Sequence, residues 1–386
     1  MGIAERYALV ALLIAVVLLF TFLPATSSTF MTAINVRQVL VNQSVIVILA
    51  IGLLYPLILG SFDISVGALA GLCAVVTATA MSRFSLPVAA AIAIGIAAGL
   101  AVGVVNAVLI AIMQLNAFIV TLGMSTLLTG LVTWYTNGNN ISNDISPGLV
   151  TFGNSTWAGI PGVLYLVAVV VLVGWYTLGH TPFGRYVHAV GSNKRAAQLV
   201  GIRVTRMTFI CFLVSGGLAG VAGVAMVATS GGAVVSEGPS LLFPVLTAVF
   251  LSATTINTGR YNVAGTVVGV LLIASAVSGL NLAGAENWVE DVFDGGALVV
   301  AVAISTYLAR QRRRAGAGKE MAPPAEEEGR AFEELVMDKR ESILFRPVMW
   351  YAVYHIDQKT ARRRTSTVRP ARVSVILTWP GIQYST

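Results

Sequence analysis

One carboxylate interrupts a long apolar stretch near the start of the chain. The segment "LGSFDISVGALAGL" covers residues 59–72, and Asp63 is the only charged residue between positions 37 and 83. An ionisable side chain in apolar surroundings of this length is a candidate functional group if those surroundings are a bilayer. Small and polar residues on both sides of the carboxylate predict a helix break whose freed backbone groups bond to polar side chains. The residues of this predicted break are Gly60, Asp63, Ser65 and Gly67.

The composition indicates that the surroundings are indeed a bilayer. Of the 386 residues, 56% are hydrophobic and only 11% are charged, and the mean hydropathy is +0.82. A soluble domain has roughly a quarter of its residues charged, so this chain has too little polar surface to stay in water. The net charge of +7 does not indicate a nucleic-acid partner, because residues 84–184 contain no Lys or Arg that could follow a phosphate backbone.

The apolar runs predict an all-α polytopic integral membrane protein with about ten transmembrane helices, each long enough to cross about 30 Å of hydrocarbon. The basic residues support this count. With the N-terminus inside, the Lys and Arg at positions 6, 185–206, 260 and 310–314 fall inside, and only Arg37 and Arg83 fall outside. The positive-inside rule requires this bias, so both termini are predicted to be cytoplasmic. The predicted spans are residues 7–23, 44–60, 66–81, 86–112, 115–134, 162–178, 208–229, 241–257, 262–282 and 289–308.

The predicted organisation also includes a tail after the last span and two long connections between spans. Residues 1–314 form the transmembrane domain, and residues 315–386 are a polar, charged segment that we expect to be a mostly disordered cytoplasmic tail. The connection 135–161 is rich in Asn, Ser and Gly, which suits an external loop. Residues 179–207 form the longest internal loop. Its segment "NKRAAQLVGI" predicts a short helix that begins after Asn193 and ends at Gly201.

Motifs for catalysis and for metal or nucleotide binding are missing from the sequence. No HExxH, CxxC pair or Gly-x-Ser-x-Gly occurs, and the three histidines are scattered over loop and tail. In "AGAGKE", Lys319 is followed by Glu where a phosphate-binding loop needs Ser or Thr. Cys73 and Cys211 lie in apolar runs and are predicted to be buried, unpaired side chains. We therefore expect no cofactor, no metal and no enzymatic activity.

Three stretches together carry a family resemblance. They are "GSFDISVGALAGL" at 60–72, "NAFIVTLGMSTLLTGLVTWYTNG" at 116–138, and the segment 181–224, which holds Phe-Gly-Arg, Gly-x-Asn, Ala-Ala and Gly-Ile elements in order. In order and spacing they resemble the membrane permease subunits of bacterial ATP-binding-cassette (ABC) importers for monosaccharides, of the ribose, xylose and galactose type. The resemblance covers roughly residues 35 to 308. The sequence departs from this family at Ala117, where proline is usual, in the turn 252–265, and in the tail.

The resemblance implies the partners and the location. Two ABC ATPase domains on separate chains would bind ATP, an extracytoplasmic sugar-binding protein would deliver the monosaccharide, and a second permease copy or a paralogue would complete the pathway. The chain would be a multi-pass protein of the bacterial cytoplasmic (inner) membrane, in contact with membrane lipid and with no nucleic acid. The resemblance also assigns two groups of residues. The ATPase-coupling loop contains Arg185, Asn193, Ala196, Ala197 and Gly201, and the helix break or translocation pathway contains Gly60, Asp63, Ser65, Gly67, Phe118 and Thr121.

Several alternatives stay open at this point. For Asp63, pinning of the helix break is the favoured role and direct sugar contact is the alternative. Permeases for branched-chain amino acids share a looser version of the same motifs. An ion-coupled secondary transporter would need carboxylates or histidines near the bilayer midplane. Asp63 is one candidate, and the others lie at the start of the last predicted span, at positions 290, 291 and 294. A membrane-embedded hydrolase is disfavoured because no histidine lies in any predicted span.

Overall fold

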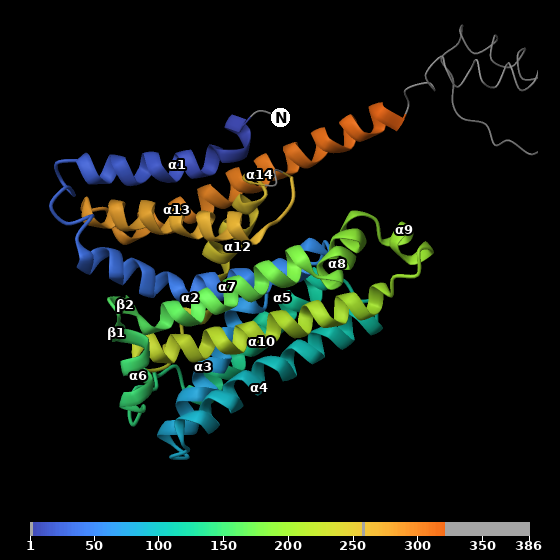
Figure 1. Ribbon diagram of the computed structural model, residues 1–386. Helices are drawn as coiled ribbons and strands as arrows, with labels where there is room; N and C mark the ends of the chain where they lie inside the picture. Colours follow the sequence, from blue (N-terminus) through green and yellow to red (C-terminus); the bar gives the residue numbers. More distant parts are fainter. Residues whose placement is uncertain (1–2, 257–258, 321–386) are drawn as a thin grey trace, which may run out of the picture. The chain divides into compact units, whose positions relative to one another are not determined.

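The computed structural model describes residues 3–256 and 259–320, and the chain divides into two compact units, Met1–Gly316 and Ala317–Thr386. The described residues of the first unit form helices and one hairpin, whose two strands have two residues each (Figure 1). The predicted tail lies outside the described residues from position 321 onward. The elements are α1 (Ile3–Phe22), α2 (Ala33–Ile58), α3 (Val66–Ser82), α4 (Val88–Ala107), the π-helix η1 (Val108–Ile112), α5 (Ala117–Thr136), α6 (Pro147–Asn154), β1 (Thr156–Trp157), β2 (Ile160–Pro161), α7 (Gly162–His180), α8 (Pro182–Ser192), α9 (Lys194–Leu199), α10 (Val204–Ser230), α11 (Glu237–Ser240), α12 (Leu242–Ser252), α13 (Val263–Leu282) and α14 (Asn287–Glu320).

The predicted all-α membrane class is confirmed. Within the described residues, 6 helices are long and apolar enough to cross a bilayer: α2, α4 continued by η1, α5, α7, α10 and α13. Three further apolar helices are shorter, at Tyr7–Phe22, Val66–Ser82 and Glu237–Ser252. The chain is therefore a multi-pass helical protein, whereas the number of ten spans stays a prediction.

The eighth predicted span, residues 241–257, is shorter in the structure than expected. Helix α12 ends at Ser252. The Asn262 side chain donates to the Ser252 carbonyl at 2.7 Å and accepts from the Gly265 backbone N–H, also at 2.7 Å, which caps α13. The same side-chain nitrogen donates to the Thr255 carbonyl at 3.1 Å. Polar side chains thus bind the backbone of residues 252–255, so the apolar run does not continue as a helix.

Helix α10 lies at the centre of the bundle and packs against α2, α3 and α4. Figure 1 shows α10 and α4 side by side along much of their length. The two backbones approach closely at Gly99 and Gly216, where a Cβ on either residue would overlap the carbonyl oxygen of the other. Small residues make such close contact possible between helices in lipid, where the hydrophobic effect does not drive their association.

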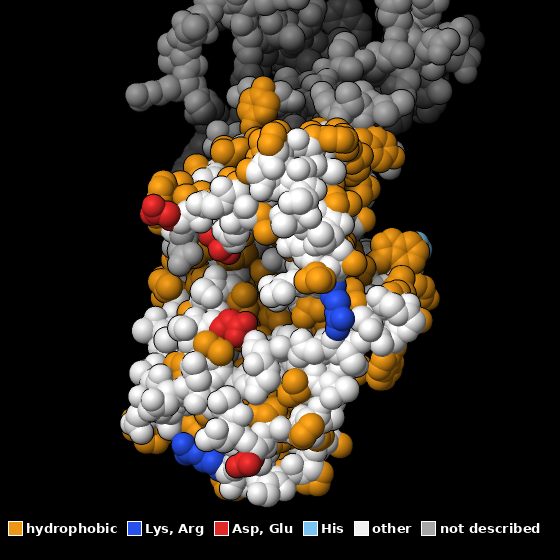
Figure 2. Space-filling view, turned by 90° about the vertical axis from the view of Figure 1, so that its left-hand side faces the viewer, with side chains coloured by type: hydrophobic (Ala, Val, Ile, Leu, Met, Phe, Trp, Pro, Cys, Tyr) orange, Lys and Arg blue, Asp and Glu red, His pale blue; other side chains and the backbone are white. Residues whose placement is uncertain are grey.

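The two ends of the bundle differ in charge. One end carries α6, β1 and β2, and the other carries α8 and α9 (Figure 1). Arg37 donates a hydrogen bond to the Asn154 carbonyl, and the Arg83 guanidinium lies 4.8 Å from the centre of the Tyr135 ring. Both arginines therefore lie at the end that carries the connection 135–161. Figure 2 shows this end, where polar and backbone atoms dominate the described surface and charged side chains are few.

Candidate functional site

The predicted helix break lies between α2 and α3. Gly60 has φ +76°, a left-handed conformation that glycine adopts without strain. The Ser61 N–H donates to the Pro56 carbonyl at 2.9 Å and closes the turn. Gly67 differs from the prediction because it lies inside α3. A Cβ at Gly67 would lie 2.6 Å from the Gly238 carbonyl oxygen, so this glycine permits close contact with α11 and does not form the break.

The Asp63 carboxylate is buried and accepts hydrogen bonds at both oxygens. Its side chain is 2% exposed. Oδ1 accepts from the Ser65 backbone N–H at 3.1 Å and from the Ser65 hydroxyl at 2.6 Å. Oδ2 accepts from the Ser215 hydroxyl at 2.8 Å. The carboxylate therefore fastens the break to the start of α3 and to the middle of α10, and its described partners are uncharged donors.

Helix α5 satisfies another backbone group of the break. The Ile64 N–H donates to the Thr121 hydroxyl oxygen at 3.1 Å, and that hydroxyl donates to the Ala117 carbonyl at 2.8 Å. Thr121 is fully buried, and the structure places its hydroxyl beside the break, at the backbone of Ile64. Phe118 lies one turn earlier on α5 and is half exposed, outside this hydrogen-bonded network. Phe62, from the break itself, is also partly exposed and contacts the Phe250 ring at a centroid distance of 6.2 Å.

Sequence reasoning missed two residues of this network, Asn106 and Ser215. The Asn106 amide nitrogen donates to the Ser65 hydroxyl at 3.0 Å, and both residues are at most 1% exposed. The Asn106 amide oxygen is buried and has no hydrogen-bond partner in the described part of the chain. Asn106 also lies just before the π-helix η1, and π-turns are frequent at functional sites. Each missed residue is a polar side chain within an otherwise apolar helix, which is the signal that could have identified it.

The second candidate region is the connection between α7 and α10. The predicted short helix is confirmed as α9: Asn193 accepts from the Ala196 N–H at 3.1 Å at its start, and Gly201 follows its end with φ +85°. The sequence reasoning did not predict the longer helix α8, whose signals are the Thr181 cap and the proline after it. The Thr181 hydroxyl accepts from the Gly184 N–H at 3.3 Å.

The exposed surface of α9 differs from the one expected. Ala197 is 4% exposed, so it packs inward and seats the helix, whereas Ala196 points to solvent together with Arg185 of α8. Two large apolar residues occupy the tip of this region, because Leu199 is 88% exposed and Val200 is 77% exposed. Exposed apolar residues at the tip of a projecting turn are typical of a surface that a partner protein covers.

Helix α8 packs against the transmembrane helices directly beside the break. A Cβ on Gly191 would overlap the carbonyl oxygen of Ile58, the last residue of α2 and two residues before Gly60. His188, also on α8, is largely buried near Arg260. Burial and the neighbouring guanidinium lower the pKa of the His188 imidazole, so it is neutral at pH 7. Helix α8 therefore lies against the end of α2, and Arg260, in the turn that precedes α13, is near enough to affect its histidine.

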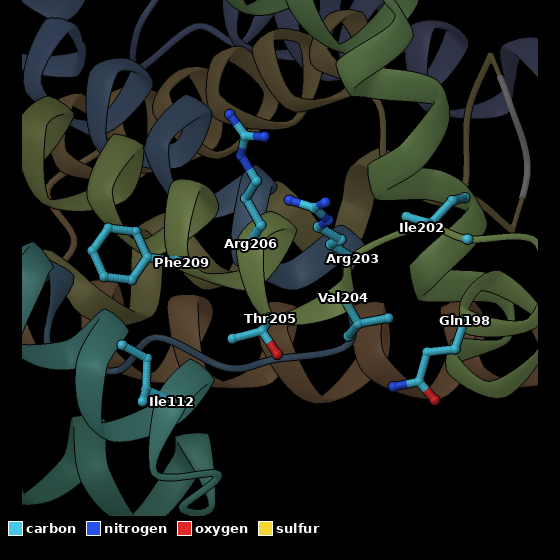
Figure 3. A pocket seen from close by; sticks show the side chains of 9 residues that line it. Ile112, Gln198, Ile202, Arg203, Val204, Thr205, Arg206 and Phe209 are labelled. Atoms are coloured by element: carbon cyan, nitrogen blue, oxygen red, sulfur yellow. The ribbon is translucent and has the colours of Figure 1, made fainter.

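An open depression of about 660 Å³ lies where α9, η1 and the start of α10 meet (Figure 3). Ile112 and Phe209 form an apolar side of it, and Gln198 lies at the opposite side. The guanidinium groups of Arg203 and Arg206 extend in the same general direction in this view. The depression can receive an apolar or acidic side chain of a partner.

We predict that Asp63→Asn is tolerated better than Asp63→Leu. Asn keeps an acceptor for Ser65 and can donate to the Ser215 hydroxyl. Leu leaves the donors at Ser65 and Ser215 unpaired in a low-dielectric site, at about 1–3 kcal/mol each. The measurement is the thermal unfolding midpoint of the purified variants in detergent, with Thr126→Val on the exposed face of α5 as the control. Midpoints for Asn and Leu that both equal the wild-type value would contradict the structural role of the carboxylate.

The comparisons with known proteins agree with the resemblance of the three sequence stretches. The family model described as "Branched-chain amino acid transport system / permease component" matches residues 35–302. The ribose import permease protein of Haemophilus influenzae is 30% identical over 302 residues, which is 78% of this chain and 93% of the relative. That of Bacillus subtilis is 34% identical over 275 residues, 71% of this chain and 85% of the relative.

A further relative is named for a different substrate. The autoinducer 2 import system permease protein of Photorhabdus laumondii is 31% identical over 313 residues, 78% of this chain and 92% of the relative. No solved structure matches the chain significantly. The family model covers more than half of the sequence, and the motifs that carry the resemblance lie inside the matched range. The chain therefore belongs to the permease family of the branched-chain amino acid transport system type.

Proposed function

We propose that the chain is the membrane permease subunit of an ATP-driven ABC importer that moves a monosaccharide into the bacterial cytoplasm. The observation that carries this proposal is the similarity to ribose import permeases over 78% of the chain and 93% of the relative. The buried Asp63 network supports it as a structural centre of the membrane domain. The exposed turn that follows α9 supports it as a place where an ATPase can act.

In the proposed topology, the protein crosses the inner membrane ten times and both of its termini lie in the cytoplasm. The support for this topology is the separation of charge between the two ends of the bundle. Lys194, Arg195 and Arg203 are exposed on or beside α9, whereas the connection 135–161 at the opposite end contains no Lys or Arg. The positive-inside rule places the α8–α9 end in the cytoplasm.

The proposed partners follow from this orientation. A separate ABC ATPase subunit binds ATP and contacts α9, where Leu199 and Val200 are exposed. An extracytoplasmic sugar-binding protein contacts the end that carries α6. A second permease copy or a paralogue contributes the other half of the pathway, since the chain itself carries exposed aromatic residues, including Phe62 and Phe118, beside the break. ATP binding and sugar delivery must each favour a different conformation for the cycle to run.

The substrate class is a more specific proposal than the transport function itself. The relatives are named as import permeases for ribose and for autoinducer 2, whereas the family description names branched-chain amino acids. We favour a monosaccharide because the ribose import permeases match the chain over nearly their whole length. A branched-chain amino acid or another small polar solute is the alternative. Ion-coupled transport is the second alternative, and it would use Asp63 as the carrier of the coupling ion.

Uptake by proteoliposomes tests the function. The chain is reconstituted with its cognate ATPase, binding protein and any paralogous permease, and radiolabelled ribose, xylose, galactose and leucine are compared. We expect uptake of a sugar that requires ATP and the binding protein and persists when an uncoupler collapses the ion gradient. The purified chain alone should hydrolyse no ATP above background. Uptake abolished by the uncoupler at constant ATP, or uptake of leucine only, would contradict the proposal.

We predict that Gly201→Val abolishes uptake and weakens association with the ATPase, without lowering the amount of protein in the membrane. Val is strained at φ +85°, so the end of α9 must rearrange. Gly201→Asn is the matched variant, because Asn tolerates this conformation and should retain activity. Gly179→Val, in α7 with open space around it and ordinary helical backbone, is the control. Co-purification of the ATPase gives the readout. Full association and uptake with Gly201→Val would mean that this turn is not the coupling element.

We predict the sidedness of two positions by cysteine labelling. Both natural cysteines, Cys73 and Cys211, are fully buried, so the background reaction with a membrane-impermeant maleimide should be low. Asn139→Cys should be labelled in intact spheroplasts, and Lys194→Cys only after the membrane is permeabilised. The reverse pattern would invert the topology and remove the ATPase from the α8–α9 end.

A further inference from the structure

A narrow apolar groove lies between α3, α4 and α5, at the end of the bundle that carries the connection 135–161. Its volume is about 410 Å³. The lining is almost entirely aliphatic and aromatic, so it offers few hydrogen-bond partners for the hydroxyl groups of a sugar. Its lining residues include Leu72, Val76, Thr79, Ile94, Leu131 and Trp134.

An arginine lies beside this groove. Arg83, directly after α3, places its guanidinium 4.8 Å from the centre of the Tyr135 ring, and Tyr135 lines the groove. Arg83 is the only Lys or Arg between positions 38 and 184. Within the described residues its guanidinium makes this ring contact and no ion pair. An unpaired guanidinium beside an apolar groove matches a ligand with an anionic head and an apolar chain.

An unpaired hydroxyl lies one helical turn below this cation. Thr79 is 6% exposed and lines the groove, and its hydroxyl has no hydrogen-bond partner in the described part of the chain. Residues four apart lie on one face of a helix, and the helical backbone at Arg83 continues α3, so Thr79 and Arg83 lie on the same side of it. Threonine in a helix adopts either of two rotamers, which lets its hydroxyl turn toward a carbonyl oxygen.

The length of the groove matches the position of an acyl chain in a bilayer. From Leu72 to Arg83 the helix rises about 16 Å at 1.5 Å per residue. Half of the hydrocarbon core is about 15 Å thick. Phe84 and Trp134 line the groove and are largely exposed, and Tyr135 also lines it; such aromatic residues are enriched at the membrane–water interface. The groove therefore extends from the level of the head groups toward the middle of the bilayer.

We propose that this groove binds one acyl chain of an anionic phospholipid. The Arg83 guanidinium pairs with the lipid phosphate, the Thr79 hydroxyl donates to an ester carbonyl, and the chain lies along Val76 and Leu72. The proposal requires that the chain lies in a bilayer, but it does not depend on which solute is imported or on the ATPase.

Lipid retention by the purified full-length chain tests the proposal. The protein is delipidated in detergent and titrated with phosphatidylglycerol or phosphatidylcholine, with bound lipid counted by native mass spectrometry. We expect phosphatidylglycerol to be retained at least about tenfold more tightly than phosphatidylcholine. Val76→Phe should fill the groove and abolish this retention, whereas Val173→Phe, a matched change on the exposed face of α7, should not.

Removal of the Arg83 charge gives an independent test of the lipid preference. Arg83→Gln should remove the preference for the anionic lipid, whereas Arg37→Gln, which removes the other arginine at this end, should preserve it. Thr79→Val should weaken retention with little change in folding. Soluble glycerol phosphate should not displace the bound lipid, since it lacks the chain.

Two results would overturn the proposal. One is equal retention of both lipids by the wild type and by Arg83→Gln, which would indicate only non-specific surrounding lipid. The other is a change of oligomeric state in Val76→Phe, measured by light scattering, with unchanged lipid retention. That result would mean that a second copy of the chain covers the groove.

Discussion

The requirement that the Asp63 carboxylate stay hydrogen-bonded constrains the whole centre of the membrane domain. A buried ionised group without partners is very costly in a low-dielectric medium. Its donors come from Ser65 at the start of α3 and from Ser215 in α10. The Asn106 side chain of α4 donates to the Ser65 hydroxyl, and the Thr121 hydroxyl of α5 accepts from the Ile64 backbone N–H. Four helices, α3, α4, α5 and α10, therefore meet at one polar point, and none of them can move far there without another hydrogen-bond partner taking its place.

The break that Asp63 pins is also next to the region proposed to receive the ATPase. Gly191 of α8 lies directly against the carbonyl of Ile58, and Gly60 follows two residues later. A push on α8 would be transmitted to the end of α2 because a Cβ-free contact leaves no compressible side chain between the two backbones. Gly60 is the residue that can absorb a change in backbone direction, since hinges are few residues at element ends. The carboxylate would then keep α3 and α10 in register while α2 moves.

Parts of the structure that depend on neighbouring residues in the sequence could be predicted, and the ends of α9 are an example. The left-handed Gly201 and the Asn193 cap depend on neighbouring backbone atoms, so the sequence pattern identifies α9 correctly. The hydrogen-bond partners of Asp63 were not predictable in the same way, because Ser215 lies 152 residues away and pairing over that separation depends on helix packing. The role of Gly67 and the inward orientation of Ala197 also depend on packing. Each is determined by the neighbouring element that buries the residue. The early end of α12 depends on Asn262, a polar residue beyond the apolar run.

The chemistry of the Asp63 site also bears on how transport is energised. A carboxylate that carries a coupling ion must exchange that ion with water, whereas Asp63 is 2% exposed and its oxygens already accept from serine donors. Hydrogen bonds at both carboxylate oxygens suit a group that holds two segments together better than one that loads and unloads a cation. The ATP-driven cycle proposed above needs its energy to enter through another part of the chain. The exposed apolar pair Leu199 and Val200, at the tip of the helix pair seated against α2, provides a surface through which a partner protein can supply it.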